Sequence, residues 1–467
     1  MAKKTKAASL TIEEKLEQAL VVPGYEPYKI PDNWCWVRMN SISNFERGIT
    51  FPASAKEKEK SFANIPCLRT ANVQETLDIS DLIYVDKTYM KNNPAKLVKK
   101  KDILMSIANS KELVGKTSLI NSFTGPMTFG GFVMAIRSKI VADYLFYYLR
   151  NEFYSGRFIG DSTQTTNIAN INSTMLGQIE TPVPPLAEQQ RIVERIESLF
   201  SKLDEAKEKA QEVIDSFEIR KAAILHKAFS GELTAKWREE NGVGLESWES
   251  HQISDLCKIN PPKVNTKQLA DDLLVSFFPM PALSAVYGEI TEPQTRRLQE
   301  VKKGFTNFIE GDVVFAKITP CMENGKSAVI GKLVNNIGYG TTEFYVLRCS
   351  DKLFNRYLYH LLRSKSFRDE AKSTMTGAVG QQRVPKSFIE EYHIMTPPID
   401  EQKEIVSLLD SEINDLQHSN DIAESVIDQI DTMKKAILAR AFRGELGTND
   451  PEEESAVELL KQILTGE

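Results

Sequence analysis

The sequence predicts an α+β protein with an internal pseudo-twofold repeat: two mixed α/β domains joined by two long helices that pack as an antiparallel coiled coil. Three observations lead to this fold class. Segment 184–233 matches segment 397–446 without a gap, at an offset of 213 positions. Each segment starts with Pro-Pro and has no further proline or glycine before Gly231 or Gly444, so each predicts one uninterrupted helix. The residues before each copy mix short apolar runs with helical patterns, which suits α/β domains.

The composition is that of a folded protein. The chain has 467 residues, of which 41% are apolar and 26% charged, and its net charge is −6. The five cysteines form no Cys-x-x-Cys pair and the five histidines no His-Glu-x-x-His, which argues against a disulfide framework, a zinc site and a metallohydrolase. The longest uncharged run, 117–136, is too polar and too interrupted by glycine and proline for a membrane helix. We therefore expect a soluble, cytoplasmic protein that uses neither a membrane nor a metal.

The repeat divides the chain into five parts. They are an N-terminal arm with a first variable domain (1–183), a first conserved helix (184–236), a second variable domain (237–396), a second conserved helix (397–446) and a C-terminal tail with a short helix (447–467). Within the variable domains, apolar runs predict strands, and helical patterns follow them. The strands are expected at 65–73, 102–107 and 312–318, and the helices at 142–153 and 353–365.

The conserved helices have the spacing of a coiled coil. From Ile192 to Phe217, apolar residues recur in alternating steps of four and three. The second helix keeps this register, but Glu412 and Ser419 interrupt it, so we expect an imperfect or polar partner there. A helix of about 45 residues would be roughly 68 Å long and could not be stable alone in water. Its own copy is the expected partner, antiparallel because a domain separates the two; two unrelated amphipathic helices are the alternative.

Two motifs resemble catalytic sites and are rejected. Gly-Lys-Thr at 115–117 and Gly-Lys-Ser at 325–327 match the end of a phosphate-binding P-loop, but the glycine required five residues earlier is Ser110 or Pro320. Asn-Pro-Pro-Lys at 260–263 lacks the aromatic residue with which adenine methyltransferases stack on a flipped base. We therefore expect no catalytic residue and no cofactor in this chain.

The repeated motifs carry a family resemblance. The helix start P-P-[LI]-x-E-Q-x-x-I-V, the helix end A-F-x-G-E-L, the stretch Leu68–Gln74 and the stretch Ile318–Lys326 are similar to the specificity subunit of type I restriction–modification systems. The resemblance covers almost the whole chain.

This resemblance implies a non-catalytic DNA-recognition subunit. Each variable domain would be a target-recognition domain that reads one half of a bipartite, asymmetric double-stranded target. The helices would set the spacing and dock two methylation subunits, which bind S-adenosylmethionine; further restriction and translocation subunits would bring ATP and Mg. A coiled-coil scaffold or adaptor that does not bind DNA is the alternative.

Candidate DNA-binding residues are polar or basic side chains in loops of the variable domains, because base reading needs Arg, Lys, Asn or Gln and phosphate contact needs cations and hydroxyls. In the first domain they are Arg47, Asn109, Ser110, Lys111, Lys116, Thr163, Gln164, Thr165 and Asn167. In the second they are Lys317, Thr319, Asn324, Lys326, Thr376, Gln381, Gln382 and Arg383.

Other polar residues have structural interpretations. Glu188, Gln189, Glu401 and Gln402, at the helix starts, are expected to cap the helices or to bind partner subunits. Arg69 and Asn72 are as consistent with structural contacts near a sheet edge as with DNA binding.

Overall fold

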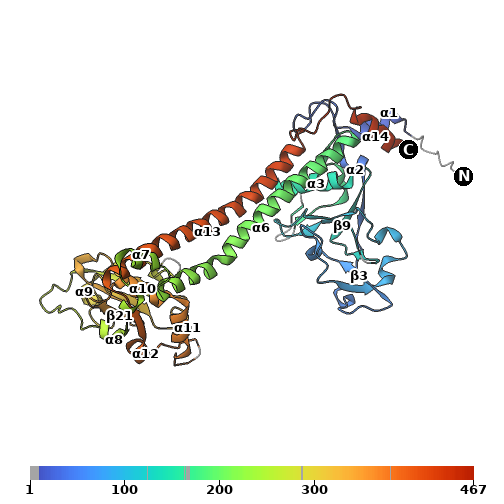
Figure 1. Cartoon of the computed structure of the whole chain (residues 1–467). Helices are drawn as coiled ribbons and strands as arrows, with labels where there is room; N and C mark the ends of the chain where they lie inside the picture. The colour runs from blue at the N-terminus through green and yellow to red at the C-terminus, as the bar shows by residue number, and fades with distance from the viewer. Residues whose placement is uncertain are drawn as a thin grey trace. The chain divides into compact units, whose positions relative to one another are not determined.

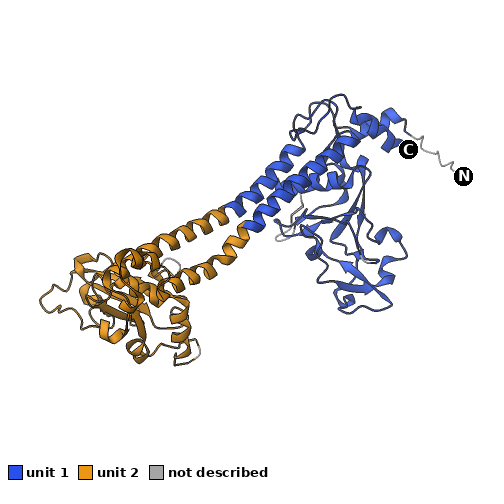
Figure 2. Ribbon diagram, viewed as in Figure 1, with its two compact units in different colours: residues 1–209, 426–467 blue, residues 210–425 orange. Residues whose placement is uncertain are grey.

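The computed structural model describes residues 10–123, 125–161, 163–164, 169–285, 288–378 and 380–466. The chain divides into two compact units (Figure 2): unit 1 combines Met1–Lys209 with Val426–Glu467, and unit 2 is Ala210–Ser425. Both long helices, α6 (Leu186–Ser230) and α13 (Ile399–Ala441), contribute to each unit (Figure 1). Each unit therefore contains one variable domain and one stretch of the two helices.

In each unit the beginning of one long helix packs against the end of the other. In unit 1, Ile192 and Ile196 near the start of α6 share a hydrophobic core with Leu438 at the end of α13. In unit 2, Leu225 near the end of α6 shares a core with Leu409 near the start of α13. The predicted antiparallel coiled coil is therefore confirmed.

Ion pairs within unit 1 fix the same antiparallel direction. Asp204 of α6 pairs with Lys434 of α13, and one turn further along α6 Lys207 faces Asp431 at 3.5 Å. From the first pair to the second, the residue number rises on α6 and falls on α13, as it must for antiparallel helices. Each pair has at least one exposed carboxylate, so the apolar seam rather than charge supplies most of the stability.

The interrupted part of the seam is shifted by one residue. Glu412 and Ser419 are exposed, and the neighbouring Ile413 and Asn420 turn inward instead. Asn420 is buried, and its Oδ1 has no hydrogen-bond partner among the described residues. The expected polar interruption is thus a single amide inside the helix pair.

Glycine ends both long helices, as the sequence predicts. α6 stops at Ser230, because Gly231 has a φ of 84°. The predicted first helix, 184–236, is therefore too long, and a separate helix α7 (Ala235–Asn241) follows. α13 stops at Ala441, shortly before Gly444 at a φ of 74°.

The variable domain of unit 1 is built on an antiparallel sheet in the order β2–β9–β5–β7, with further sheets in the orders β4–β3–β8, β1–β12 and β10–β11–β6. The strands are β1 (Cys35–Arg38), β2 (Ser43–Arg47), β3 (Asn64–Leu68), β4 (Ile83–Asp86), β5 (Ile103–Ser106), β6 (Ala108–Asn109), β7 (Thr117–Leu119), β8 (Thr128–Phe129), β9 (Val133–Ser138), β10 (Thr163–Gln164), β11 (Ala169–Asn170) and β12 (Glu180–Val183). The helices are α1 (Ile12–Ala19), α2 (Met39–Ile42), α3 (Ala142–Tyr154), α4 (Arg157–Asp161), α5 (Ser173–Gly177) and α14 (Ala456–Thr465).

Unit 2 repeats this plan with sheets in the orders β14–β21–β18–β19, β16–β15–β20–β17 and β13–β22. The strands are β13 (Glu249–Gln252), β14 (Cys257–Ile259), β15 (Leu274–Phe278), β16 (Gln294–Arg297), β17 (Thr306–Phe308), β18 (Val313–Ala316), β19 (Ser327–Val329), β20 (Gly338–Gly340), β21 (Phe344–Cys349) and β22 (His393–Thr396). The helices beside α7 are α8 (Ile253–Leu256), α9 (Leu298–Val301), α10 (Asn355–Arg363), α11 (Lys365–Ser373) and α12 (Lys386–Glu391).

A buried ion pair recurs at the same place in the main sheet of each unit. Asp102, before β5, binds Arg137 of β9 at 3.0 Å, and Asp312, before β18, binds Arg348 of β21 at 2.8 Å. Both aspartates are almost fully buried. Because a buried carboxylate is stable only when paired, this shared contact shows that the two domains are built on one framework.

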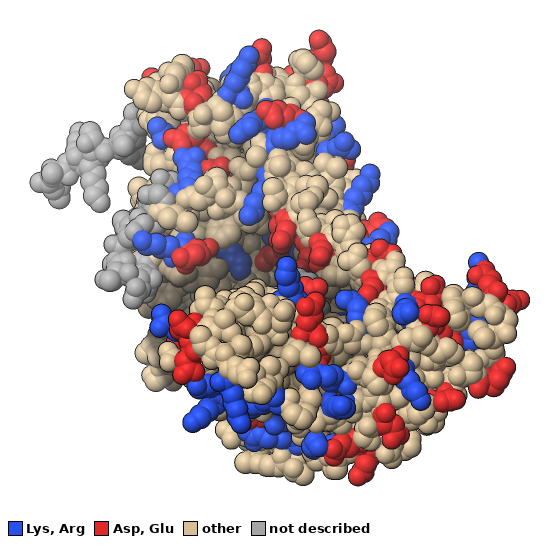
Figure 3. Space-filling model, turned by 90° about the vertical axis from the view of Figure 1, so that its left-hand side faces the viewer, with Lys and Arg blue, Asp and Glu red and all other residues tan. Residues whose placement is uncertain are grey.

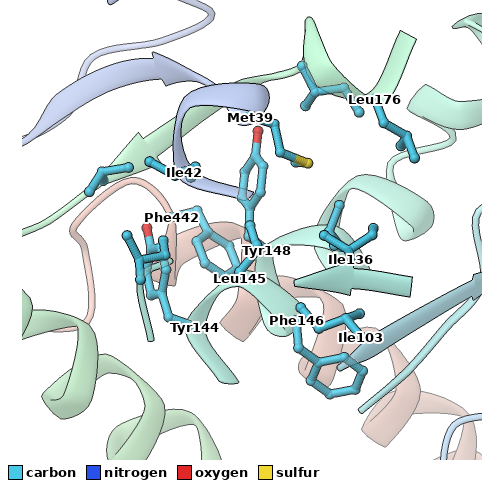
Figure 4. Close-up of a cluster of buried hydrophobic side chains, with 14 of the residues drawn as sticks. Met39, Ile42, Ile103, Ile136, Tyr144, Leu145, Phe146, Tyr148, Leu176 and Phe442 are labelled. Atoms are coloured by element: carbon cyan, nitrogen blue, oxygen red, sulfur yellow. The ribbon is translucent and has the colours of Figure 1, made fainter. Parts of the chain in front are cut away.

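The main core of unit 1 gathers side chains from distant parts of the chain (Figure 4). Tyr144 and Tyr148 of α3 contact Phe442, just after α13, with ring centroids 5.4 and 5.2 Å apart. The tyrosine hydroxyls donate to the backbone oxygens of Pro182 and Glu180. The C-terminal part of the chain is thus integral to unit 1.

The expected strands and helices of the variable domains are present. The strand predicted at 65–73 is shorter than expected, since β3 ends at Leu68 and a 3₁₀ turn over Thr70–Asn72 follows. Asn72 is buried, and its side chain bonds the backbone of Arg69, Asp78 and Asp81, which supports its structural interpretation. Among the described residues, none of the helices combines the length and the apolar character that a membrane crossing requires.

Candidate nucleic-acid interface

Loops predicted to read DNA in unit 1 come together in one small sheet. Thr163 of β10 lies opposite Asn170 of β11, and Ala169 of β11 lies opposite Asn109 of β6. We call β10, β11 and β6 the unit 1 loop sheet. β6 follows directly after the core strand β5, so the rigid main sheet positions these loops.

Unit 2 brings its predicted residues together in the same way. The backbones of Thr376 and Arg383 exchange hydrogen bonds of 3.0 and 2.8 Å, and Ile318 forms a bridge with Arg383. Thr319 N–H donates to Gln382 O at 3.0 Å, and its hydroxyl accepts from Gln382 N–H at 3.1 Å. We call these segments, together with Lys317, the unit 2 loop sheet.

The two loop sheets occupy equivalent positions in the repeat. Thr163 and Thr376 are 213 positions apart, as are Asn170 and Arg383. The backbone pairing is therefore conserved between the units, while the side chains that it presents differ. A common frame with different polar side chains is what two readers of different sequences require.

The guanidinium of Arg383 is held by a carboxylate. It donates to Glu343 through Nε at 2.9 Å and through a terminal nitrogen at 2.8 Å, and it also donates to Gln381 O. The hydrogen bonds from Arg383 lower the pKa of Glu343. Glu343 directly precedes β21, and its backbone oxygen accepts from Lys317 N–H at 3.0 Å, so this ion pair lies beside the unit 2 loop sheet.

The predicted residues around the unit 1 loop sheet have different surroundings. Arg47, at the end of β2, is exposed and donates from Nε to Gly131 O at 2.9 Å. Asn109 bonds Ser106 and the backbone N–H of Ser110. Lys111 is exposed in the turn between β6 and β7. Gln164 lies in β10; Thr165 and Asn167 lie outside the described residues.

Two predicted lysines are engaged inside their own units. Lys116 donates to the Gln74 side chain, and Lys326 donates to Met280 O at 3.1 Å. Each bond ties the hairpin of the main sheet to a segment next to the second sheet. Asn324, in the same hairpin as Lys326, is exposed, whereas Lys317 lies with its Nζ 5.0 Å from the centre of the Tyr345 ring. DNA contact by these four remains a prediction.

The glutamates at the helix starts have a structural role. Glu188 is fully buried and accepts from Trp34 Nε1 at 2.7 Å and from Asn449 Nδ2 at 2.9 Å. Glu401 is also fully buried and accepts from Trp248 Nε1 at 3.0 Å and from Arg238 at 2.7 Å.

The neighbouring glutamines are buried as well. Gln189 Oε1 accepts from Val141 N–H at 3.0 Å, and Gln402 Oε1 accepts from Phe354 N–H at 2.7 Å, next to the first turns of α3 and α10. A side chain without accessible surface cannot contact another protein. The structure thus corrects the predicted partner-binding role of Glu188, Gln189, Glu401 and Gln402: they lock each long helix onto its domain.

The two Gly-Lys motifs form equivalent hairpins. Gly115 (φ 88°) lies between β6 and β7, and Gly325 (φ 70°) lies between β18 and β19. A P-loop leads into a helix whose N-terminus holds the phosphate, whereas a strand follows here. Both glycines therefore serve a turn.

The net negative charge does not prevent local basic surface. On the face drawn in Figure 3, Lys and Arg side chains gather near the lower edge, with Asp and Glu among them. In unit 2 the exposed strand β16 ends in Arg296 and Arg297. Binding to a polyanion depends on where the charges lie rather than on their sum.

Sequence reasoning missed residues that the loop sheets single out. Asn170 was not proposed, although the 213-residue offset from Arg383 leads directly to it. Glu343 and the exposed Phe132 were missed because a carboxylate and a lone aromatic residue are not typical DNA-binding signals. Only the backbone pairing places them beside the loop sheets.

Comparison with known protein families finds the type I restriction modification DNA specificity domain twice, over residues 31–215 and 245–426. The type I restriction enzyme EcoAI specificity subunit of Escherichia coli is 34% identical over 260 residues, which are 47% of this chain and 44% of that protein. The EcoKI specificity subunit of Escherichia coli (strain K12) is 23% identical over 461 residues, 93% of this chain and 96% of that protein. The match thus spans less than half of the first relative and almost all of the second.

Two solved structures share the fold. The HsdS subunit from Thermoanaerobacter tengcongensis has a TM-score of 0.59 at 18% identity, covering 90% of this chain and 99% of that chain. A chain from a structural study of complex assembly and conformational transition of the type I R-M system has a TM-score of 0.63 at 18% identity, covering 90% of this chain and 100% of that chain. The two matches to the specificity domain cover most of the sequence and fall on the two halves of the repeat. This chain therefore belongs to the family of type I restriction–modification specificity subunits.

Proposed function

We propose that this chain is the DNA-recognition subunit of a type I restriction–modification complex and is not itself catalytic. Each loop sheet reads one half of a bipartite, asymmetric target. The observation that carries the proposal is the pair of loop sheets: equivalent backbones present different polar side chains, Asn170 in one unit and Arg383 in the other.

The chemistry of modification belongs to partner subunits in this proposal. Two methylation subunits bind S-adenosylmethionine, and restriction subunits use ATP and Mg. The names of the relatives, all specificity subunits of type I restriction enzymes, support this division of labour. Within the described residues, no group of three or more His, Cys, Asp or Glu side chains is placed to hold a metal ion.

In this proposal the partner subunits bind to a surface other than the buried starts of the long helices. The exposed faces of α6 and α13 carry charged residues and are the surfaces of the conserved part that remain accessible. A gel shift with the partner methylation subunits and random duplexes separates this proposal from a scaffold that binds no DNA. The assembled complex is the right material, since we expect phosphate contact to be shared with the partner subunits and the chain alone to bind DNA only weakly.

The direct test is to express the chain with its methylation subunits in a host without other adenine methylation and to sequence the methylated adenines. We expect one interrupted motif with two unlike halves. Exchange of residues 1–183 for the corresponding domain of another family member should change one half alone. A continuous motif, or a change in both halves, contradicts separate reading by the two units.

A further inference from the structure

A large apolar side chain stands exposed beside the unit 1 loop sheet. Phe132 lies in the turn between β8 and β9, and 64% of its surface is accessible. Isolated exposed apolar residues are common and need no explanation by themselves. Phe132 differs from them because a tightly bonded turn holds it next to the unit 1 loop sheet.

The turn that carries Phe132 is tightly held. Val133 N–H donates to Gly130 O at 2.8 Å across the turn, and Gly48 N–H donates to Val133 O at 3.0 Å. A Cβ atom at Gly48 would lie 2.2 Å from Gly130 O, so only glycine lets β2 approach this closely. The Arg47 side chain braces the turn from outside through its bond to Gly131 O. A packed turn thus presents the aromatic ring to solvent.

Phe132 adjoins the residues predicted to read DNA. Ile107 N–H donates to Phe132 O at 3.0 Å, and β6 with Asn109 begins at the next residue. The turn of Phe132 is therefore bonded to Arg47 at the end of β2 on one side and to Ile107, two residues before Asn109 of the loop sheet, on the other. Most base-reading contacts in the major groove are hydrogen bonds. An exposed phenyl ring makes an apolar contact instead, and the base group that it contacts there is the C5-methyl group of thymine.

The equivalent position in unit 2 has the opposite chemistry. There Lys317 N–H donates to Glu343 O, as Ile107 N–H donates to Phe132 O in unit 1. Glu343 holds the guanidinium of Arg383. The same backbone position therefore presents an apolar ring in unit 1 and a carboxylate–guanidinium pair in unit 2.

We propose that Phe132 determines specificity in unit 1 by packing its ring against a thymine methyl group in the half-site that this unit reads. This inference rests on the proposed function. Unit 2 reads its own half-site at the equivalent position through the hydrogen-bonding groups of Arg383. The difference between the two positions then contributes to the asymmetry of the target.

The test uses the full chain assembled with its methylation subunits, on duplexes that contain the target found by sequencing methylated adenines. Phe132→Ala should weaken preference for thymine at one position of one half-site by about 4-fold, as expected for the lost burial of one methyl-sized apolar group. Replacement of that thymine by deoxyuridine, which removes only the methyl group, should weaken wild-type binding and leave binding of Phe132→Ala unchanged. Phe132→Leu should restore part of the preference.

Phe62 provides the matched control. It is a phenylalanine of the same unit, 97% exposed, and it lies next to Lys87 rather than in the loop sheet. Phe62→Ala should leave both half-sites unchanged. The inference is overturned if Phe132→Ala reads the target as the wild type does, if both half-sites change alike, or if deoxyuridine has no effect. Failure of the wild-type complex to methylate any specific target would instead refute the proposed function.

Discussion

The indole N–H of Trp248 donates to the buried carboxylate of Glu401, 3.0 Å away, as Trp34 donates to Glu188 at 2.7 Å in unit 1. The other hydrogen-bond partners of each carboxylate differ between the two units. Arg238 forms an ion pair with Glu401 at 2.7 Å, whereas the amide of Asn449 bonds Glu188 at 2.9 Å. The same buried glutamate is thus balanced by a cation in one unit and by a neutral donor in the other.

This difference predicts unequal costs of the same substitution. Glu401→Gln leaves the charge of the nearly buried Arg238 unpaired and should reduce the free energy of unfolding by about 3–5 kcal/mol. Glu188→Gln leaves neutral donors without their full acceptor and should cost about 1–3 kcal/mol. Denaturant unfolding of both variants measures this. An equal or larger loss for Glu188→Gln would contradict the role assigned to Arg238.

Asn420 predicts a stabilising substitution. Its Oδ1 is buried in the helix pair without a partner among the described residues, while its Nδ2 donates to Glu424 at 3.0 Å. Asn420→Leu removes this unsatisfied acceptor and should raise the free energy of unfolding by about 1–2 kcal/mol. Thermal unfolding measures the change, with the exposed Ser419→Leu as the control that should bring no gain. A loss of stability in Asn420→Leu would show that the amide is needed there.

His360 predicts a loss of stability in mild acid. It lies buried in unit 2 with Nε2 3.0 Å from Asp410, which also pairs with Arg356, at the wall of a cavity of about 750 Å³. Burial lowers the pKa of His360, and Arg356 and Arg363 act in the same direction, against Asp410. The unfolded chain therefore takes up this proton more readily than the folded chain. The contribution of His360 to the free energy of unfolding is therefore fully present above about pH 6.5 and decreases as the pH falls below that value.

The carboxyl group of Asp410 affects the stability at a lower pH than His360 does. Burial opposes the shift, but the hydrogen bonds from His360 and Arg356 lower the pKa of Asp410 overall, so its contribution is lost only in stronger acid. Urea midpoints at about pH 7.5 and 5.5, on either side of the ordinary histidine pKa, isolate the histidine. They should fall with pH in the wild type and change less in His360→Gln. An equal pH dependence in both would show that other groups cause it.

The pair of Glu343 and Arg383 predicts a change in the salt dependence of DNA binding. Glu343→Gln removes the carboxylate that neutralises the guanidinium, so the Arg383 cation that reads the base should also attract the neighbouring phosphates with its full charge. The slope of log affinity against log salt should then become steeper by about 1. Titration of the complex with duplex at several salt concentrations measures this. Glu310→Gln, an exposed glutamate of the same unit, removes one negative charge elsewhere and should leave the slope nearly unchanged.

The repeat, the helix pair and the framework of the variable domains could be predicted from the sequence because they depend on local periodicity. The seam from Ile192 to Phe217 is visible as spacing alone. The burial of Asn420 in place of Ser419 was missed because the heptad pattern alone does not show which of two neighbouring residues faces the partner helix.

The buried helix starts and the loop sheets depend on contacts between distant residues. Glu188 looked accessible because charged residues at a helix start usually are, and its partner Trp34 lies 154 positions earlier. The nearness of Phe132 to β6, and of Glu343 to Arg383, follows from strand pairing that no local pattern encodes. For the same reason the sequence could nominate loops that pair with one another in the structure but could not rank their side chains.

The division of the chain into units has a consequence for its synthesis. Unit 2 is continuous in sequence, from Ala210 to Ser425, whereas unit 1 needs both Met1–Lys209 and Val426–Glu467. Phe442 and Asn449, which complete the core and the glutamate site of unit 1, leave the ribosome after the whole of unit 2. The variable domain of unit 1 is therefore made before unit 2 but completes its core only after it, and until then its exposed apolar surface is open to chaperones and proteases.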